Sequence, residues 1–104
     1  MKKNRLVLTD AAAADIVEQG DWYDTQSGKA LAERWEEGVA SAIRRVLNRP
    51  DTGTPCRFKE PQLSGLRRIS IPRFPKHLLF YVSDGDEILV IRVVHGARDL
   101  ESLF

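Results

Sequence analysis

Residues 77–95 read HLLFYVSDGDEILVIRVVH, and this stretch decides the fold. Two runs of branched and aromatic residues flank the turn-forming sequence Asp84-Gly85-Asp86. Such a pattern is typical of a β-hairpin. We therefore expect one strand over His77–Ser83 and a second over Glu87–His95.

A third strand candidate lies just upstream, over Gly65–Phe74. Its apolar residues are Leu66, Ile69 and Ile71. Pro72 cannot donate a ladder hydrogen bond, so we expect it to mark a bulge or an edge. Short connections between the three segments predict an antiparallel meander.

Two helices are expected before these strands. Residues 29–48 carry apolar side chains at three- and four-residue intervals: Leu31, Trp35, Val39, Ala42, Ile43 and Val46. We expect another helix over Ala11–Thr25, with Thr9 as its N-cap and Asp10 in its first turn. Ser27-Gly28 would end this helix, so that the two helices form a hairpin. Arg5–Leu8 predicts a short strand before them. Residues 51–61 are rich in turn formers and predict a loop.

The expected fold class is therefore α+β: an N-terminal strand, a helical hairpin, then a three-stranded antiparallel meander. The chain has 104 residues, 42% hydrophobic residues and a net charge of +1, which fits a single domain over residues 1–104. The near-neutral charge excludes nucleic-acid binding through bulk charge alone. No apolar run is long enough to span a membrane, and no signal peptide is evident. The lone Cys56 excludes an internal disulfide, and we expect a cytoplasmic location.

The last strand carries apolar residues on both sides. Strict alternation gives two sets, Leu89, Ile91 and Val93 on one face and Ile88, Val90 and Val94 on the other. Arg92 interrupts the second set. Two helices cover only one face of a four-stranded sheet, so we expect the other face to offer a protein partner an apolar patch with an arginine. The alternative is a strand covered on both sides by loops and the C-terminal tail.

Charge is unevenly distributed along the chain. Acidic residues predominate from Asp10 to Glu37, in the expected helices. From Arg57 to His77 the sign reverses, with Arg57, Lys59, Arg67, Arg68, Arg73 and Lys76 against Glu60. A basic sheet surface could hold phosphates or an acidic polypeptide; an ordinary solvated surface is the alternative.

Several segments resemble ParE toxins. In the C-terminal half these are Leu66-Arg67-Arg68-Ile69, Phe80-Tyr81-Val82 and residues 91–100, which contain His95-Gly96-Ala97-Arg98-Asp99. The N-terminal half agrees, with an Ala-Asp-Ile helix, the aromatic pair Trp22-Tyr23 near its end, and a longer helix closing at Arg49-Pro50. The chain is thus identified as similar to the RelE/ParE superfamily of toxin–antitoxin modules, often described as plasmid stabilisation proteins.

The resemblance implies a type II toxin that inhibits DNA gyrase by binding, with no chemical step of its own. Its target-binding residues would be Arg98, Asp99, Leu103 and Phe104. It also implies a ParD-like antitoxin with an acidic, amphipathic C-terminal segment, joined to the toxin in a hetero-oligomer. That segment would lie in the helical groove and over the sheet, on Ile88, Val90, Arg92, Arg67 and Arg73. The antitoxin, not this chain, would contact DNA.

Ribonuclease members of the superfamily give the alternative function. RNA cleavage by a 2′-hydroxyl needs a proton acceptor, a proton donor and cations on the phosphate. Such members place an arginine where this chain has Leu78, three residues before Tyr81, and a tyrosine or histidine near the end, where it has Phe104. These departures favour the gyrase inhibitor. A ribosome-dependent ribonuclease would use Arg68, Arg73, His77 and Arg98, and an inactive antitoxin-binding module is a third possibility.

The remaining candidates favour structural roles. His77 has the pKa range of a general base, yet a solvent-facing strand-end histidine is the simpler interpretation. His95 would orient the turn into Gly96, and Cys56 would be a plain thiol. Trp22, Tyr23 and Trp35 would pack in the core or between helices. With no Gly-rich phosphate loop and no metal-ligand cluster in the sequence, we expect no cofactor and no metal.

Overall fold

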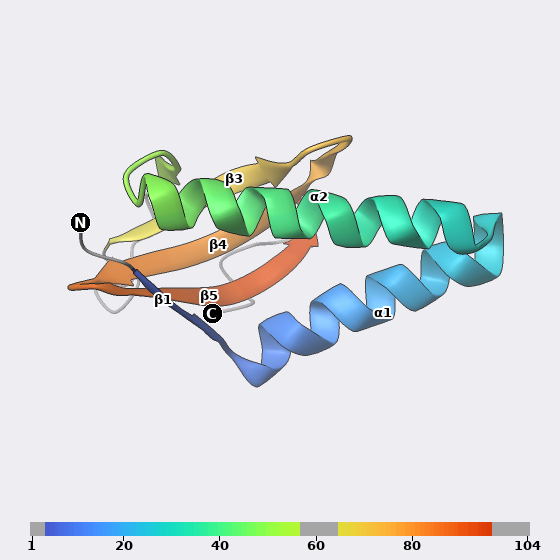
Figure 1. Ribbon diagram of the computed structural model, residues 1–104, viewed down its shortest axis with the longest axis horizontal. Coiled ribbons are helices and arrows are strands. Elements are labelled where there is room, and N and C mark those ends of the chain that lie inside the picture. The colour runs from blue at the N-terminus through green and yellow to red at the C-terminus, as the bar shows by residue number, and fades with distance from the viewer. Residues whose placement is uncertain (1–3, 57–64, 97–104) are drawn as a thin grey trace.

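The computed structural model describes residues 4–56 and 65–96 (Figure 1). In chain order the elements are β1 (Arg5–Leu8), α1 (Asp10–Ser27), α2 (Lys29–Asn48), β2 (Thr54–Pro55), β3 (Leu66–Ile71), β4 (Phe74–Asp84) and β5 (Glu87–His95). One sheet has the strand order β1-β5-β4-β3-β2, and the helical hairpin covers one of its faces. The predicted α+β fold is confirmed.

The predicted antiparallel pairing of β3, β4 and β5 is also confirmed. The first strand joins the sheet beside the last one, in parallel, with Arg5 opposite Glu87 and Leu8 opposite Val90. The sheet has five strands where four were expected, because the predicted loop over residues 51–61 contains β2. Its two residues pair with β3, Thr54 opposite Arg68.

The helical hairpin follows its local signals. The Thr9 hydroxyl accepts a hydrogen bond from the Ala12 amide at 3.0 Å and so caps α1, as its position before the alanine run predicts. Gly28 adopts a φ of 94°, which an L-residue rarely tolerates, and separates the two helices. The bounds of α2 are those predicted, whereas α1 runs to Ser27, two residues further than expected.

The strand expected over Gly65–Phe74 divides in two. Pro72 and Arg73 form a tight turn between β3 and β4, next to a register shift at Ser70/Ile71. Arg73 has a φ of 70°, a conformation that is costly for a residue with a side chain. Helix α2 lies against this turn, since a Cβ on Gly38 would stand 2.8 Å from the Pro72 carbonyl oxygen. Pro72 therefore ends a strand and does not bulge within one.

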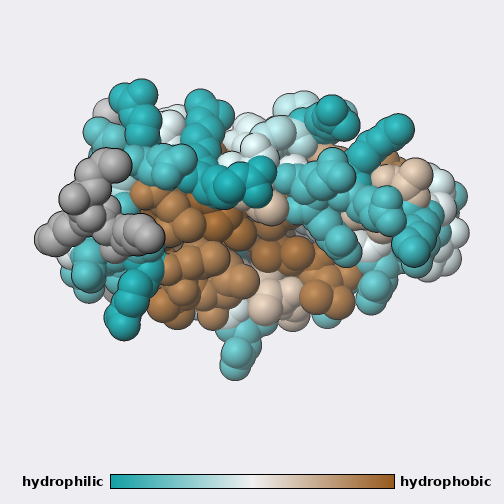
Figure 2. Space-filling model, viewed as in Figure 1, coloured by the Kyte–Doolittle hydropathy of each residue, from teal (hydrophilic) through white to brown (hydrophobic). Residues whose placement is uncertain are grey.

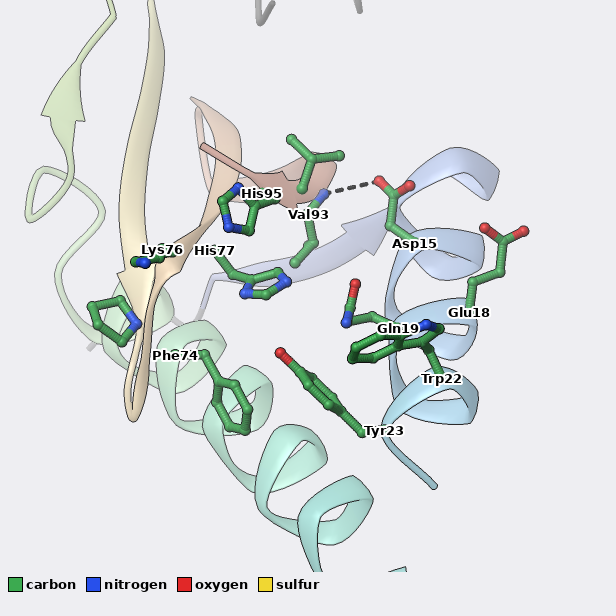
Figure 3. A pocket seen from close by; sticks show the side chains of 12 residues that line it. Asp15, Glu18, Gln19, Trp22, Tyr23, Phe74, Lys76, His77, Val93 and His95 are labelled. Atoms are coloured by element: carbon green, nitrogen blue, oxygen red, sulfur yellow. Dashed lines mark hydrogen bonds between the residues drawn. The ribbon is translucent and has the colours of Figure 1, made fainter. Parts of the chain in front are cut away.

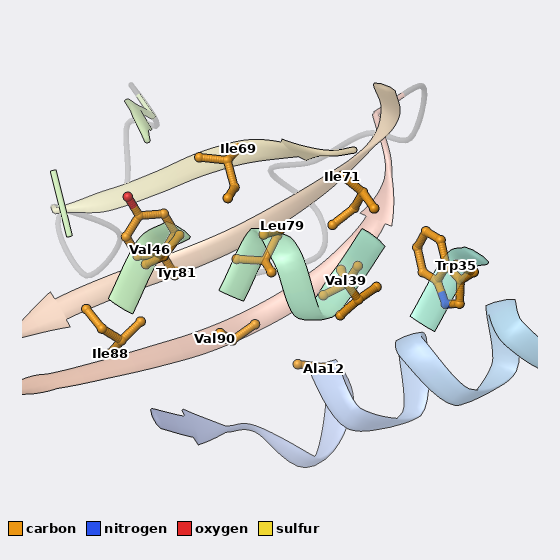
Figure 4. Packing of buried hydrophobic residues seen from close by; sticks show 12 residues of the cluster. Ala12, Trp35, Val39, Val46, Ile69, Ile71, Leu79, Tyr81, Ile88 and Val90 are labelled. Atoms are coloured by element: carbon orange, nitrogen blue, oxygen red, sulfur yellow. The ribbon is translucent and has the colours of Figure 1, made fainter. Parts of the chain in front are cut away.

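The core lies between the helices and the sheet (Figure 4). Side chains from both layers meet there: Ala12, Trp35, Val39, Ala42 and Val46 from the helices, and Ile69, Ile71, Leu79, Tyr81, Ile88, Val90 and Val93 from the strands. The Tyr81 hydroxyl accepts a hydrogen bond from the Gly53 amide and donates one to the Pro50 carbonyl, both at 2.8 Å. These bonds tie the loop after α2 to the sheet.

The predicted assignment of faces in β5 is wrong. Phe80 pairs with Arg92 and Tyr81 with Val90, so Ile91 is an extra residue in a β-bulge. The bulge shifts the alternation by one residue. Ile88 and Val90 consequently share the helix-covered face with Val93, and Val94 moves to the opposite face.

The face away from the helices carries a second buried cluster. Leu66, Phe80 and Val94 form it, with Cys56, Leu78, Val82 and Ile91 partly buried around them. An open apolar patch was expected on this face. These three side chains are buried instead, which corresponds to the alternative of a sheet covered on both sides. Within the described residues, neither helix is apolar enough over the required length to cross a membrane.

Candidate functional site

A cavity of about 640 Å³ opens between α1 and the adjoining ends of β4 and β5 (Figure 3). Its volume lies within the range of ligand pockets. Most of the side chains around it are aromatic or polar, and three are aliphatic: Asp15, Glu18, Gln19, Trp22, Tyr23, Phe74, Pro75, Lys76, His77, Val93, Val94 and His95. Figure 3 shows the Tyr23 hydroxyl and the His77 ring pointing into the same space. Chemically, such a cavity suits a planar or apolar group with a few hydrogen-bonding atoms.

His77 is buried, contrary to the expectation of a solvent-facing histidine. Only 7% of it is exposed, and its ring centroid lies 4.9 Å from that of Trp35 and 5.3 Å from that of His95. Burial lowers the pKa of His77, and the nearby His95 lowers it further. The side chain points to the helix side of the sheet because His77 alternates with Leu79 and Tyr81, both core residues.

The predicted packing roles of the aromatic residues are confirmed in part. Trp35 is fully buried and donates a hydrogen bond from Nε1 to the Ile16 carbonyl at 3.0 Å, and Tyr23 packs against it. Trp22 is 56% exposed, so the prediction for this residue is wrong. Adjacent helical residues point about 100° apart, so Trp22 and Tyr23 cannot both face the core. That spacing was the available signal for an exposed tryptophan.

Arg92 is bound within the chain. Its Nε and Nη2 atoms donate to the two carboxylate oxygens of Asp15 at 2.7 and 2.9 Å, and the Val93 amide donates to the same carboxylate at 3.0 Å. The side chains of Arg92 and Asp15 are only 20% and 12% exposed. The carboxylate raises the pKa of Arg92, so the guanidinium stays charged. Arg92 therefore joins β5 to α1, and its predicted contact with an antitoxin has to compete with this ion pair.

The other predicted antitoxin-binding residues fall in different places. Ile88 and Val90 are buried beneath the helices, so neither is open to a partner. Arg67 donates to the Gly53 carbonyl at 2.7 Å, beside the loop after α2. Arg73 is exposed at the β3–β4 turn. The predicted target-binding residues Arg98, Asp99, Leu103 and Phe104 lie outside the described residues.

The ribonuclease set is not brought together. Arg68 pairs with Phe80 and shares its face, away from the helices, whereas His77 lies on the helix-covered face. Arg73 is at the turn between these strands, and Arg98 lies outside the described residues. The sheet thus separates the proposed base, His77, from Arg68, one of the proposed cations.

Two further expectations concern the thiol and metals. Burial raises the pKa of Cys56, which makes its thiol less reactive than an exposed one. Across residues 4–56 and 65–96, no three His, Cys, Asp or Glu side chains are grouped as a metal site requires.

An apolar surface lies between α2 and the segment β1–α1 (Figure 2). The large apolar side chains that the described residues expose are Leu6, Val7, Leu8, Val17 and Trp22. All come from the first strand and the first helix. The apolar patch was predicted on β5, because the sequence alone did not show that β1 lies at the edge of the sheet.

Comparison with known proteins identifies the family. The family model for the ParE toxin of the type II toxin–antitoxin system parDE matches residues 6–100. The chain belongs to the ParE toxin family. No curated protein sequence gives a significant match.

Solved structures related to ParE toxins share this fold. A chain from the chromosomal ParDE toxin–antitoxin system of P. aeruginosa superposes with a TM-score of 0.73 and 20% identity, covering 91% of this chain and 98% of that one. The YoeB/ParE toxin from Agrobacterium tumefaciens gives a TM-score of 0.58 and 19% identity, over 88% and 96% of the two chains. At these identities the likeness concerns the fold alone.

Proposed function

We propose that this ParE-family toxin inhibits DNA gyrase by binding to it, and that a ParD-like antitoxin with an acidic segment neutralises it. Membership of the family over residues 6–100 supports the toxin part of the proposal. The proposed mode of action is occupation of another protein's surface, with no bond broken by the toxin itself.

The observation that carries the binding mechanism is the separation of Arg68 from His77. General acid–base catalysis needs its groups within hydrogen-bond reach of one substrate. Arg68 and His77 lie on opposite faces of the sheet, and His77 is enclosed by aromatic rings. These features support a binding protein over a ribonuclease.

The test is plasmid supercoiling by purified gyrase, with and without the purified toxin. We expect supercoiling to stop in the presence of the toxin and to resume when the antitoxin is added. Primer extension on messenger RNA after induction should show no new ends. Cleavage at codon positions with supercoiling unaffected would favour the ribonuclease; no effect in either assay, with normal growth, would indicate an inactive module.

One substitution tests whether Arg98 belongs to the gyrase-binding surface. Arg98→Ala should relieve growth arrest and supercoiling inhibition while the circular dichroism spectrum and antitoxin binding stay unchanged. Arg34→Ala, which removes an exposed arginine from α2, is the matched control and should keep full inhibition. Undiminished arrest by Arg98→Ala would remove Arg98 from the gyrase-binding surface.

The antitoxin is proposed to cover the apolar surface between α2 and β1–α1. Leu6, Leu8 and Val17 are exposed there, and single-domain proteins seldom leave such a patch uncovered. This surface replaces Ile88 and Val90, which lie beneath the helices. Arg67 and Arg73 stay predicted contacts for acidic groups of the antitoxin.

A further inference from the structure

A second hollow, of about 350 Å³, is lined by the middle of α2 and by the β3–β4 turn. Its volume is at the lower end of the range of ligand pockets. It shares no lining residue with the cavity between α1, β4 and β5. Three of its seven lining residues are arginines: Arg34, Glu37, Gly38, Ser41 and Arg44 from the helix, and Pro72 and Arg73 from the turn. The hollow is therefore a separate candidate site, and its chemistry is that of an anion-binding site.

Gly38 brings the helix and the turn close together. A Cβ at this position would stand 2.8 Å from the Pro72 carbonyl oxygen, so a side chain there would push the two elements apart. Ser41 and Arg44 follow Gly38 at three-residue intervals and lie on the same side of the helix. The close contact thus brings Arg73, which belongs to a different element, to the same hollow as Ser41 and Arg44.

Arg73 has a backbone conformation that is costly for a residue with a side chain. Its φ is 70°, and every other residue with a positive φ in the described part of the chain is a glycine. Backbone strain of this kind is concentrated at functional sites, where the surrounding structure holds it in place. The strain at Arg73 is therefore a second observation, independent of the charges, that indicates a role for this side chain in the hollow.

Two positive charges of the hollow lack a counter-charge. Arg44 and Arg73 are exposed, and neither forms an ion pair with any residue that the structure describes. Glu37 is the acidic residue of the lining, and it lies three positions from Arg34, at the spacing of neighbouring side chains on a helix. Because these two opposite charges offset each other, Arg44 and Arg73 carry the positive charge that an anion would meet.

We infer that Arg44, Arg73 and Ser41 bind a phosphate monoester or inorganic phosphate. A guanidinium group offers two parallel N–H donors that match two phosphate oxygens, and the Ser41 hydroxyl can donate to a third oxygen. A phosphate monoester carries a charge of about −1.5 to −2 near pH 7, which balances the two arginines. A carboxylate has one negative charge and only two oxygens, so it matches this set of donors less well. The inference goes beyond the proposed inhibition of gyrase and does not depend on it.

The surroundings of the hollow favour a small phosphate ligand over a nucleic-acid strand. Glu33, Glu36 and Glu37 are exposed on the same helix and would repel phosphates that continue along α2. Nucleic-acid binding depends on neutralising several phosphates at once, each with a single negative charge. Two arginines suffice for one terminal phosphate group.

NMR titration of the ¹⁵N-labelled toxin tests the proposal directly. Inorganic phosphate is the probe, added near neutral pH at constant ionic strength, and the arginine Nε–Hε signals are followed. The signals of Arg44 and Arg73 should shift and saturate. The signal of Arg49, which is exposed after the end of α2 and outside the hollow, should stay in place. Equal, unsaturated shifts of all three would show general screening of charge and would overturn the proposal.

Three further ligands identify the source of the phosphate. Saturation by adenosine 5′-monophosphate at lower concentration than inorganic phosphate would support the site and assign it to phosphorylated small molecules. Saturation by inorganic phosphate alone would support it as a site for the free anion. A single-stranded oligonucleotide without a terminal phosphate, or acetate, should bind more weakly than either. Tighter binding of the oligonucleotide or of acetate would contradict a monoester site, and in the case of acetate Arg73 would remain a contact for acidic side chains only.

Substitutions in the hollow provide the second test. Arg44→Gln removes a charge at an exposed helical position, so the fold should survive and phosphate affinity should fall about tenfold or more. Arg49→Gln is the matched control and should bind phosphate as the parent does. Arg73→Gly removes the guanidinium and relieves the positive φ, so it should weaken phosphate binding while it raises the melting temperature. Parent-like phosphate affinity in either folded variant would contradict the proposed site.

The outcome is separable from that of the proposed function. If the toxin inhibits gyrase but phosphate leaves the Arg44 and Arg73 signals unmoved, only the phosphate site fails. If phosphate binds as expected while supercoiling is never inhibited, the gyrase proposal fails and the phosphate site stands.

Discussion

Replacing Asp15 by alanine tests whether the ion pair with Arg92 holds α1 on the sheet. The carboxylate accepts two hydrogen bonds from the guanidinium and one from the Val93 amide, all between 2.7 and 3.0 Å. Asp15→Ala removes all three at once. It leaves a guanidinium that is four-fifths buried without its partner, beside an amide that has lost its acceptor.

The expected cost lies between two limits. An exposed ion pair contributes about 0–1 kcal/mol, whereas breaking a fully buried pair costs about 3–5 kcal/mol. The Asp15 and Arg92 side chains are 12% and 20% exposed, nearer the buried limit. We therefore expect Asp15→Ala to lower the free energy of unfolding by about 2–3 kcal/mol, which corresponds to a fall in melting temperature of about 10–20 °C for a chain of this size.

The assay is urea unfolding, monitored by circular dichroism. Asp21→Ala, which removes an exposed carboxylate from the same helix, is the matched control and should change stability by less than about 0.5 kcal/mol. The double variant Asp15→Ala/Arg92→Met should be more stable than Asp15→Ala alone, because it removes the unpaired charge. A loss below about 0.5 kcal/mol in Asp15→Ala would show that the pair behaves as a surface contact and would refute the reasoning.

Three further predictions concern stability. Tyr81→Phe leaves the Gly53 amide and Pro50 carbonyl without partners and should cost about 1–3 kcal/mol in urea unfolding; parent-like stability would show that water replaces the hydroxyl. Arg73→Gly relieves the positive φ and should add about 1 kcal/mol, whereas Arg73→Ala should add nothing, and equal effects of the two would exclude backbone strain as the cause. Because the folded-state pKa of His77 is lowered, the unfolded chain binds the proton more tightly, so stability should fall as the pH drops below about 6.5. His77→Phe should flatten melting temperatures between about pH 7.5 and 5.5, and an unchanged slope would point to another group.

Local sequence signals predicted most of the fold. Thr9 before the alanine run and Gly28 after it fix α1, and the apolar periodicity of α2 gives its bounds. The sequence Asp84-Gly85-Asp86 predicts the β4–β5 hairpin. These elements could be predicted because each depends on neighbouring residues alone.

Features that depend on distant pairing could not be predicted in this way. The bulge at Ile91 arises from the register of β5 against β4, and it exchanges the faces of Val93 and Val94. Pairing of β2 with β3 needs a partner beyond the expected loop. The burial of His77 depends on Trp35 and Tyr23 closing over it from the two helices.

For the candidate site, the sequence predicted an apolar surface for a protein partner but assigned it to β5. Ile88 and Val90 are central because β1 pairs beside them in parallel, a contact between residues about eighty positions apart. Arg92 was expected to be open, and no pattern linked it to Asp15. Arg67 and Arg73 stay predictions for antitoxin contacts.

The parallel pairing of β1 with β5 also governs the order of events during synthesis. The first strand emerges from the ribosome early, but its pairing with β5 cannot form until nearly the whole chain has been translated. A nascent or prematurely terminated chain would display Leu6 and Leu8 with no neighbouring strand on either side. Such fragments would expose apolar side chains and an unpaired strand, which promote aggregation.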